Sequence, residues 1–390
     1  MSLLFLPEEL VAEVLSYLPA KSLTQLRCVS KSWNTLISDP QFIKLHLQRS
    51  KKNRNLTQIL CMSLGSYILP FPLNTLLNNP SIINSTKDYF PYNPKYRYIF
   101  VGSCNGLFCF VLTLYKITYP ENTWFQLWNP ATNTLSKIYT MPNFDYFRFS
   151  GFSFGYDNSA DTYKFVYFRP NKLEIFSFGS NVWKIIQLPH TVPLNHLNRV
   201  PYKRKFLSEA MYLNDTIYLL AREIAKQIVI ISLKLGNDTY SKLLPPQDFV
   251  EVSLHLPTIH VMEESLYFSH HTQEIDFIIW KMTEFGTEKC WIQFLKISYE
   301  DLNIHPEYKN SLSPWCLYGS DFDIHMKYKY FLAPLCLYES GIILVQAANG
   351  HGLQVIVYNW IENRIEKTRM DSSVLWMVNQ NYVESLVPTS

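Results

Sequence analysis

Apolar residues between positions 6 and 48 recur at the spacing of one helical face and predict four short helices. Pro7 fits the first turn of a helix, and Pro19 ends that helix. Two shorter apolar groups follow, and Asp39 with Pro40 supplies the cap and first residue of a fourth helix. The pattern predicts a small helical module with these apolar positions: Leu10, Val11, Val14, Leu15, Leu18, Leu23, Leu26, Trp33, Leu36, Ile37, Phe42 and Leu45.

The first of these helices carries more apolar surface than so short a segment can bury against itself. At about 100° per residue its five apolar side chains cover an arc of about 140°, and Tyr17 widens that arc. A segment of this size buries less than about 60% of the surface that its unfolded chain exposes, so docking would add to its order. Two interpretations are open: the apolar arc binds another protein, or the helices form a cap packed on the rest of the chain.

Short apolar runs alternate with turn residues from position 57 onward, without a sustained helical period. This pattern predicts a body of β-strands. A strand, a turn containing Asn, Asp or Gly, and a second strand recur, and the turn residues lie 48, 56, 49 and 77 positions apart: Asn133, Asn181, Asn237, Gly286 and Asn363. Four-stranded units of about 40 to 50 residues are typical of β-propeller blades, and a β-sandwich is the alternative.

The composition agrees with a folded, strand-rich chain. Of 390 residues, 47% are hydrophobic and 15% are aromatic, and aromatic side chains suit the half-buried faces of sheets. The formal net charge of +3 is too small to indicate nucleic acid as a partner. We interpret residues 49–56, where the helical module ends, as a solvated linker because they contain the basic cluster Arg49, Lys51, Lys52 and Arg54.

The cysteine content and the lack of a long apolar run indicate the cellular compartment in which the protein is expected. Seven cysteines, an odd number scattered along the chain, favour free thiols in a reducing compartment. No run of about 18 apolar residues predicts a membrane span, and the first residues lack the basic region of a secretory signal. We therefore expect a protein of the cytoplasm, the nucleus or both, with no membrane partner.

Residues 26–33, LRCVSKSW, together with Leu6-Pro7 and Leu18-Pro19, resemble an F-box over nearly the whole helical module. The resemblance implies a Skp-family adaptor as partner and, through it, a cullin-RING ubiquitin ligase. We expect Trp33 to lie inside the module. The residues that the resemblance assigns to the adaptor are Leu6, Pro7, Leu10, Val14, Leu15, Leu18, Pro19, Leu23, Leu26 and Val29.

Several segments of the strand-rich body resemble the F-box-associated domain of plant F-box proteins, including the group similar to S-locus F-box proteins. They are residues 102–107 (GSCNGL), 127–132 (LWNPAT), 151–157 (GFSFGYD), 161–164 (DTYK) and 382–386 (YVESL). Leu219, where the family commonly has Trp, and residues 301–333 depart from the family pattern.

The resemblance implies a mostly β fold with a small N-terminal α module. Residues 1–48 would form the F-box helical module, residues 49–56 the basic linker, and residues 57–390 the F-box-associated β domain. That domain is expected to be β-propeller-like, with the β-sandwich as the alternative.

Residues able to hold a metal ion or perform catalysis are not grouped in the sequence. Cys104 and Cys109 would face opposite sides of their strands, and His270 and His271, adjacent on one strand, would also diverge. The sequence contains neither a glycine-rich phosphate loop nor a GxSxG elbow. We therefore predict no catalytic residue, no metal, no cofactor, and a non-catalytic subunit of a ubiquitin ligase complex.

The leading hypothesis is a substrate-recognition subunit of a Skp-cullin-F-box (SCF) ubiquitin ligase. The F-box would dock on the adaptor and the β domain would bind a target protein. The proximity of the target to the ubiquitin-charged enzyme would then accelerate ubiquitin transfer. Loops of the β domain should hold the target, and residues 89–94 and 301–333 are the candidates. Two alternatives stay open: a glycan-binding receptor that uses Trp124 and Trp183, and a β-propeller enzyme with an incidental helical cap.

Overall fold

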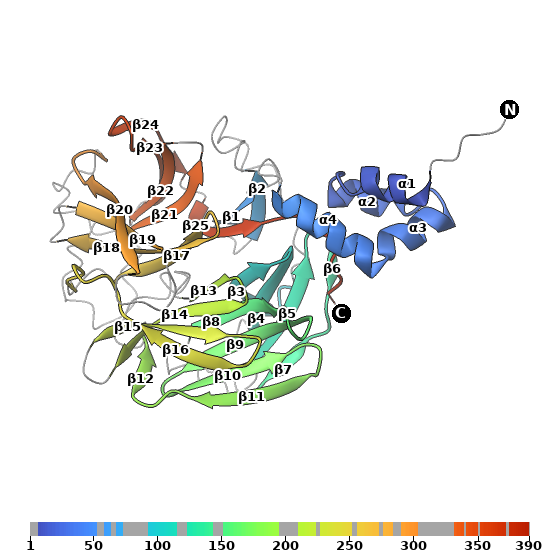
Figure 1. Ribbon diagram of the computed structural model, residues 1–390, viewed down its shortest axis with the longest axis horizontal. Helices are drawn as coiled ribbons and strands as arrows, with labels where there is room; N and C mark the ends of the chain where they lie inside the picture. Colours follow the sequence, from blue (N-terminus) through green and yellow to red (C-terminus); the bar gives the residue numbers. More distant parts are fainter. Residues whose placement is uncertain are drawn as a thin grey trace. The chain divides into compact units, whose positions relative to one another are not determined.

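The computed structural model contains four helices followed by a strand-rich body (Figure 1). The chain divides into two compact units, the first made of Met1–Leu60, Ile68–Tyr146 and Gln380–Ser390, the second of Cys61–Tyr67 and Phe147–Asn379. Among the described residues, no helix has the length and apolar character needed to cross a membrane. The structure describes residues 7–52, 58–63, 68–72, 93–114, 123–142, 151–194, 210–223, 227–251, 256–272, 276–283, 290–302, 331–338, 341–349, 352–371 and 374–389.

Four helices form where the apolar pattern predicts them, so that prediction is confirmed. Side chains cap the last two: Ser30 Oγ accepts a hydrogen bond from the backbone N–H of Trp33 at 3.1 Å, and Asp39 Oδ1 accepts one from the backbone N–H of Gln41 at 2.8 Å. The helices are α1 (Glu8–Leu15), α2 (Ala20–Leu26), α3 (Lys31–Ser38) and α4 (Pro40–Lys52).

Helix α4 continues past residue 48, where the module was expected to end. Arg49, Lys51 and Lys52 form its last turn, so the prediction of a solvated linker was wrong for residues 49–52. Positive side chains are favourable at this place because the carbonyl end of a helix carries a partial negative charge. Their helical position could not be recognised from composition, since a basic run is equally typical of solvated chain.

Antiparallel pairing joins the strands of the body from β3 to β24. In the described residues the strands form six sheets, with the orders β2-β1-β25, β3-β4-β5-β6 with β7 beside β5, β11-β10-β9-β8, β12-β14-β15-β16 with β13 beside β14, β17-β18-β19-β20, and β21-β22-β23-β24. The strands are β1 (Gln58–Ser63), β2 (Ile68–Pro72), β3 (Tyr96–Cys104), β4 (Leu107–Leu114), β5 (Thr123–Asn129), β6 (Thr134–Leu135), β7 (Tyr139–Met141), β8 (Gly151–Asp157), β9 (Thr162–Arg169), β10 (Lys172–Ser177), β11 (Val182–Gln187), β12 (Thr191–Pro193), β13 (Ala210–Leu213), β14 (Thr216–Glu223), β15 (Ile228–Lys234), β16 (Thr239–Leu243), β17 (Thr258–Met262), β18 (Ser265–Thr272), β19 (Asp276–Met282), β20 (Trp291–Ser298), β21 (Phe331–Tyr338), β22 (Ile342–Asn349), β23 (Gly352–Asn359), β24 (Arg364–Asp371) and β25 (Val374–Tyr382).

The order of the strands decides between the two fold classes that the sequence left open. All but one of the sheets in the described residues consist of strands that follow one another along the chain, as in propeller blades. A β-sandwich would distribute the strands over two packed sheets, so that alternative is wrong. The fold is mostly β and propeller-like, with a small helical module before it, as predicted.

The repeated turns lie where the sequence predicts them, between the third and fourth strands of a blade. A positive φ of 51° to 58°, which Asn tolerates better than most residues, occurs at three of the predicted turn residues, Asn133, Asn181 and Asn363. In another turn the positive φ falls on Asp238, while Asn237 accepts a hydrogen bond from a backbone N–H two residues later at 3.1 Å. Gly286 lies outside the described residues.

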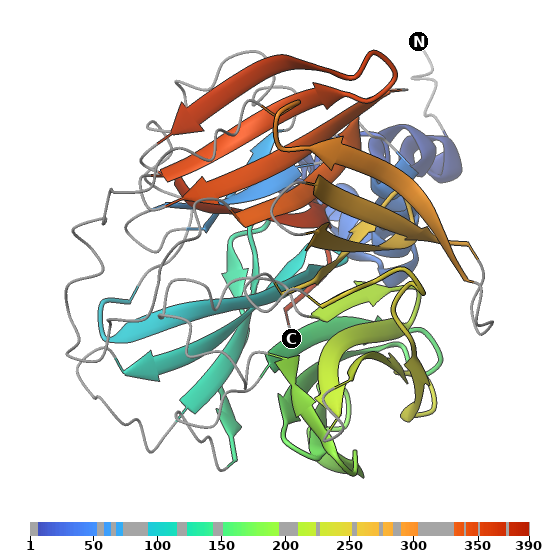
Figure 2. The ribbon, with the colours of Figure 1, turned by 90° about the vertical axis from the view of Figure 1, so that its left-hand side faces the viewer.

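Buried apolar side chains of the second unit pack between successive sheets. One cluster joins β9 and β10 to β14 and β15, and it includes Leu219. A second cluster joins β13, β14 and β15 to β17, β18 and β19, and a third joins β18 and β19 to β22 and β23. Figure 2 shows the orange sheet of β17 to β20 beside the red sheet of β21 to β24. The sheets of this unit therefore bury their faces against one another, as propeller blades do.

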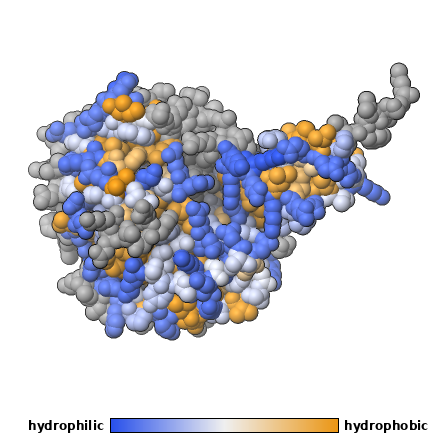
Figure 3. Space-filling view, in the orientation of Figure 1, coloured by the Kyte–Doolittle hydropathy of each residue, from blue (hydrophilic) through white to orange (hydrophobic). Residues whose placement is uncertain are grey.

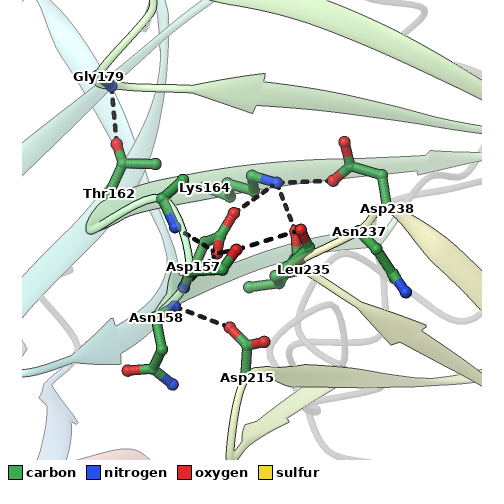
Figure 4. Close-up of polar contacts among 12 residues, drawn as sticks. Asp157, Asn158, Thr162, Lys164, Gly179, Asp215, Leu235, Asn237 and Asp238 are labelled. Carbon is green, nitrogen blue, oxygen red and sulfur yellow. Dashed lines mark hydrogen bonds and ion pairs between the residues drawn. The ribbon is translucent and has the colours of Figure 1, made fainter.

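A buried ion-pair network also joins two of these sheets (Figure 4). The ammonium of Lys164 on β9 lies 2.9 Å from Asp157 Oδ2 and 2.7 Å from Asp238 Oδ1, and it donates a hydrogen bond to the carbonyl oxygen of Leu235 at 2.5 Å. The three N–H groups of an ammonium thus all have acceptors here. The network fastens the end of β8 and the start of β9 to the turn between β15 and β16.

The surroundings of the network keep both kinds of group charged. Burial would raise the pKa of the Asp157 carboxyl, but hydrogen bonds from Ser159, Lys164 and the backbone of Ala160 outweigh burial and lower it. Burial would lower the pKa of Lys164, but Asp238 and Asp157 outweigh burial and raise it. Asp157 and Lys164 belong to the segments 151–157 and 161–164, so part of the family resemblance reflects how the sheets are fastened.

Candidate functional site

Helix α1 and the turn after it present an apolar stripe to solvent. Leu10, Val14 and Tyr17 are 51%, 64% and 65% exposed, and their spacing of four and three residues places them along one face. Val29, in the turn between α2 and α3, is 62% exposed. Figure 3 shows apolar surface gathered over these helices. Exposed aliphatic side chains in a contiguous group are typical of a protein interface.

The opposite side of the helices forms a closed core. Its buried members are Leu15, Ala20, Leu23, Ile37, Phe42 and Leu386. Trp33 packs against this core, as predicted. The module therefore buries one side of its apolar arc and leaves the other side uncovered, which explains the surplus seen in the sequence.

The structure divides the residues that the sequence assigned to the adaptor. Pro7, Leu10, Val14, Pro19 and Val29 are exposed, so a partner can reach them directly. Leu18 and Leu26 are half-buried against the core of the module. Leu15 and Leu23 are buried in that core, so they support the exposed stripe and are not themselves accessible to a partner. Leu6 lies outside the described residues.

Arg49 of α4 holds the end of α1 in place. Its guanidinium donates to the carbonyl oxygen of Glu13 at 2.8 Å and to Glu13 Oε1 at 2.5 Å, and it also donates to Ser16 Oγ. The same guanidinium lies 4.3 Å from the centre of the Tyr17 ring. Arg49 thus shares the Glu13 carbonyl near the end of α1 with the Ser16 hydroxyl, which donates to it at 2.7 Å, and it contacts an aromatic side chain of the stripe.

His46, one turn before Arg49, makes a second contact with the same region. Its Nε2 donates to the carbonyl oxygen of Leu18 at 2.9 Å, and burial lowers the pKa of the ring below its ordinary value, so the neutral form is favoured. Sequence reasoning missed both residues because they follow the F-box-like motif. Only His46 lay in the predicted helical module, because Arg49 was assigned to the linker. A fourth helix extended past residue 48 would have placed the two residues, three positions apart, on a common face.

The cysteines and histidines singled out in the sequence do not converge. Cys104 and Cys109 are buried free thiols on neighbouring strands, and burial raises the pKa of the Cys109 thiol well above its ordinary value. His270 accepts a hydrogen bond from an indole N–H at 3.1 Å, whereas His271 Nδ1 lies 2.5 Å from the hydroxyl of Tyr299. Within the part of the chain that the structure describes, no three His, Cys, Asp or Glu side chains gather as a metal site.

The two tryptophans proposed for glycan binding pack against other aromatic rings, and most of the two candidate target segments is not described. Trp124 and Trp183 are half-buried and pack edge-on or tilted against the rings of Tyr96 and Phe176, with ring centres 5.7 Å and 5.2 Å apart. Residues 89–92 and 303–330, which make up most of the two candidate target segments, lie outside the described residues.

Comparison with protein families accounts for both parts of the chain. Residues 3–45 match the F-box domain, and residues 61–389 match the F-box associated beta propeller domain. The chain belongs to the F-box associated beta propeller family. Its F-box match ends before His46 and Arg49, so the two residues of α4 that hold α1 lie beyond the F-box as the family defines it.

Relatives of this F-box protein occur in Arabidopsis thaliana. An F-box/kelch-repeat protein is 26% identical over 306 residues, which cover 75% of this chain and 79% of the relative. Another F-box protein is 26% identical over 309 residues, again 75% of this chain and 79% of the relative. Among solved structures, the β-propeller domain of the Trilobed protease from Pyrococcus furiosus is similar with a TM-score of 0.37 and 7% identity, covering 72% of each chain.

Proposed function

We propose that this F-box protein is the substrate-recognition subunit of an SCF-type ubiquitin ligase. The observation that carries the proposal is the exposed stripe of Leu10, Val14 and Tyr17 on helices whose other side forms a closed core. The match to the F-box domain supports a Skp-family adaptor as the partner of this stripe. The adaptor would then connect the chain to a cullin-RING ligase.

The form of the stripe suits a docking surface. Apolar side chains lie in its centre, and the charged residues Glu9 and Glu13 stand exposed beside them on the same helix. An apolar centre with a polar rim is the usual arrangement of protein interfaces. Arg49 restrains Tyr17 before any partner binds, which reduces the side-chain entropy lost on docking.

The β domain would present a target protein while other chains supply the ubiquitin-transfer chemistry. Its family match is to the F-box associated beta propeller domain, and in this proposal that domain binds the target and supplies no catalytic group. Membership of the S-locus F-box-like group and a place in the cytoplasm or nucleus are further parts of this proposal, drawn from the sequence motifs and the free cysteines.

Val14→Asp in the full-length protein should weaken binding to a purified Skp-family adaptor at least about thirtyfold by isothermal titration calorimetry. The expected size follows because a central interface residue contributes about 2 kcal/mol or more. Val14 is 64% exposed, so the melting temperature should stay unchanged.

Val182→Asp is the matched control because Val182 is similarly exposed, at 57%, but lies on β11 of the second unit. It should bind the adaptor as the wild type does. A wild-type chain that does not bind the adaptor, or a Val14→Asp variant that binds as tightly as wild type, would contradict the proposed function.

A further inference from the structure

A short segment after the last strand completes the core of the F-box helices. We call residues 383–389 the strap. Leu386 of the strap is only 2% exposed and belongs to the same buried cluster as Leu15, Leu23 and Ile37. Ala131, in the turn between β5 and β6, packs against that cluster as well. The F-box helices thus do not close their core alone, as expected for a module of so few residues.

Asn129, the last residue of β5, fixes the backbone of the strap. Its side-chain Nδ2 donates to the carbonyl oxygens of Ser385 at 3.0 Å and Val387 at 2.8 Å. Its Oδ1 accepts from the backbone N–H groups of Ala131 at 2.9 Å and Thr132 at 3.3 Å. Asn129 is fully buried, and these four bonds use both donors and both acceptor sites of its amide.

The turn between β3 and β4 makes a second set of contacts with the strap. Ser385 Oγ donates to the carbonyl oxygen of Asn105 at 2.7 Å. Gly106 has a φ of +82°, and a Cβ placed on it would lie 2.3 Å from Ser385 Oγ and 2.7 Å from the carbonyl oxygen of Val383. A side chain at position 106 would therefore strain the backbone and displace the strap.

Three of the segments that resemble the family in sequence therefore meet at one place. Segment 102–107 supplies the turn that accepts Ser385, segment 127–132 supplies Asn129, and segment 382–386 supplies the first part of the strap, including Ser385 and Leu386. Together these contacts place Leu386 against the F-box helices.

We propose that Leu386 is a positioning residue for adaptor docking, and that Asn129, Gly106 and Ser385 hold it in place. Leu386 fills the core beneath the exposed stripe and so keeps the helices in the arrangement that the adaptor binds. The inference rests on the proposed function, since it concerns the same docking surface. If the arrangement is only partly populated, the apparent adaptor affinity falls by the same fraction.

The test uses the full-length chain and a purified Skp-family adaptor. Leu386→Ala should weaken adaptor binding at least about tenfold, because the cavity it leaves destabilises the docked arrangement of the helices. Leu386→Met, which keeps the volume, should stay within about threefold of wild type. Leu135→Ala removes an exposed leucine of β6, in the sheet that contains Asn129, and should leave the affinity unchanged.

Hydrogen exchange separates positioning of the helices from general stability. Leu386→Ala should speed exchange in α1, α2 and α3 and leave β9, β10, β14 and β15 of the second unit as in wild type. Gly106→Ala should reproduce this pattern through the displaced strap, although residue 106 is remote from the helices in sequence.

The outcomes distinguish the two proposals. A wild-type chain that fails to bind the adaptor would overturn the proposed function and with it this inference. Tight binding by wild type and equally tight binding by Leu386→Ala would overturn the role of Leu386 alone. Faster hydrogen exchange in all the sheets as well as in the helices of Leu386→Ala would also contradict the positioning role, because Leu386 would then contribute to general stability.

Discussion

Replacing Lys164 with Met should lower the free energy of unfolding of the β domain by about 3–5 kcal/mol, because removal of one partner of a buried ion pair leaves the Asp157 carboxylate without its counter-charge. Asp157 is 1% exposed and would lose the ammonium 2.9 Å from its Oδ2, while the carbonyl oxygen of Leu235 would lose its donor. Urea unfolding followed by circular dichroism measures the change.

Lys184→Met is the control for that experiment. Lys184 also pairs with Asp238, at 2.9 Å, but its side chain is mostly exposed, and such surface pairs contribute only about 0–1 kcal/mol. A loss of stability in Lys184→Met equal to that in Lys164→Met would show that the contact with Asp238, and not the burial of Asp157, determines the effect.

Replacing Leu23 with Ala should disorder the F-box helices, since truncation of a buried leucine costs about 2–5 kcal/mol and a module of this size has little stability to lose. Limited proteolysis should then cleave within α1 to α3, and adaptor binding should fall as a consequence. Val29→Ala should weaken adaptor binding without new cleavage, because Val29 is exposed and supports no core.

The motif assigns both Leu23 and Val29 to the adaptor. The two variants distinguish direct contact with the adaptor from support of the helical core. If Leu23→Ala kept the helices resistant to protease while losing adaptor binding, Leu23 would contact the adaptor directly. The arrangement of the core would then need revision. If both variants showed the same protease cleavage and the same loss of adaptor binding, the distinction between the exposed face and the residues beneath it would be wrong.

Local features of the fold could be predicted from the sequence. The four helices follow from apolar spacing and from the caps Ser30 and Asp39, which act within three residues of their own position. The blade turns follow from Asn133, Asn181 and Asn363, because the positive φ they adopt is a property of the residue itself. Each of these signals depends on neighbours in sequence and needs no knowledge of the tertiary fold.

Features that depend on packing between remote segments could not be predicted in the same way. Val14 and Leu15 are adjacent and both belong to the apolar arc, yet Val14 is exposed and Leu15 is buried, because Leu386 and Ala131 help to close only one side of the helices. Arg49 was assigned to a solvated linker because it belongs to a basic cluster, and its contacts with α1 join residues 36 positions apart. No periodicity within one sequence reports such a contact.

The assignment of residues to the adaptor stays a prediction, and the motif did not distinguish exposed from buried side chains. In the structure Leu10, Val14 and Val29 are exposed, so a partner can reach them, whereas Leu15 and Leu23 are buried. The strap was visible in the sequence only as a family-like segment, without a sign of which element it contacts. Its partner Asn129 lies more than 250 positions away.

The proposed function requires that the exposed face of the F-box helices docks on a Skp-family adaptor. Hydrogen exchange of the full-length chain, measured with and without saturating adaptor, tests this docking. We expect slower exchange in α1 and in the turn between α2 and α3, with no change in β9 to β20 of the second unit. Unchanged exchange in the helices under saturating adaptor, or protection confined to the sheets, would contradict it.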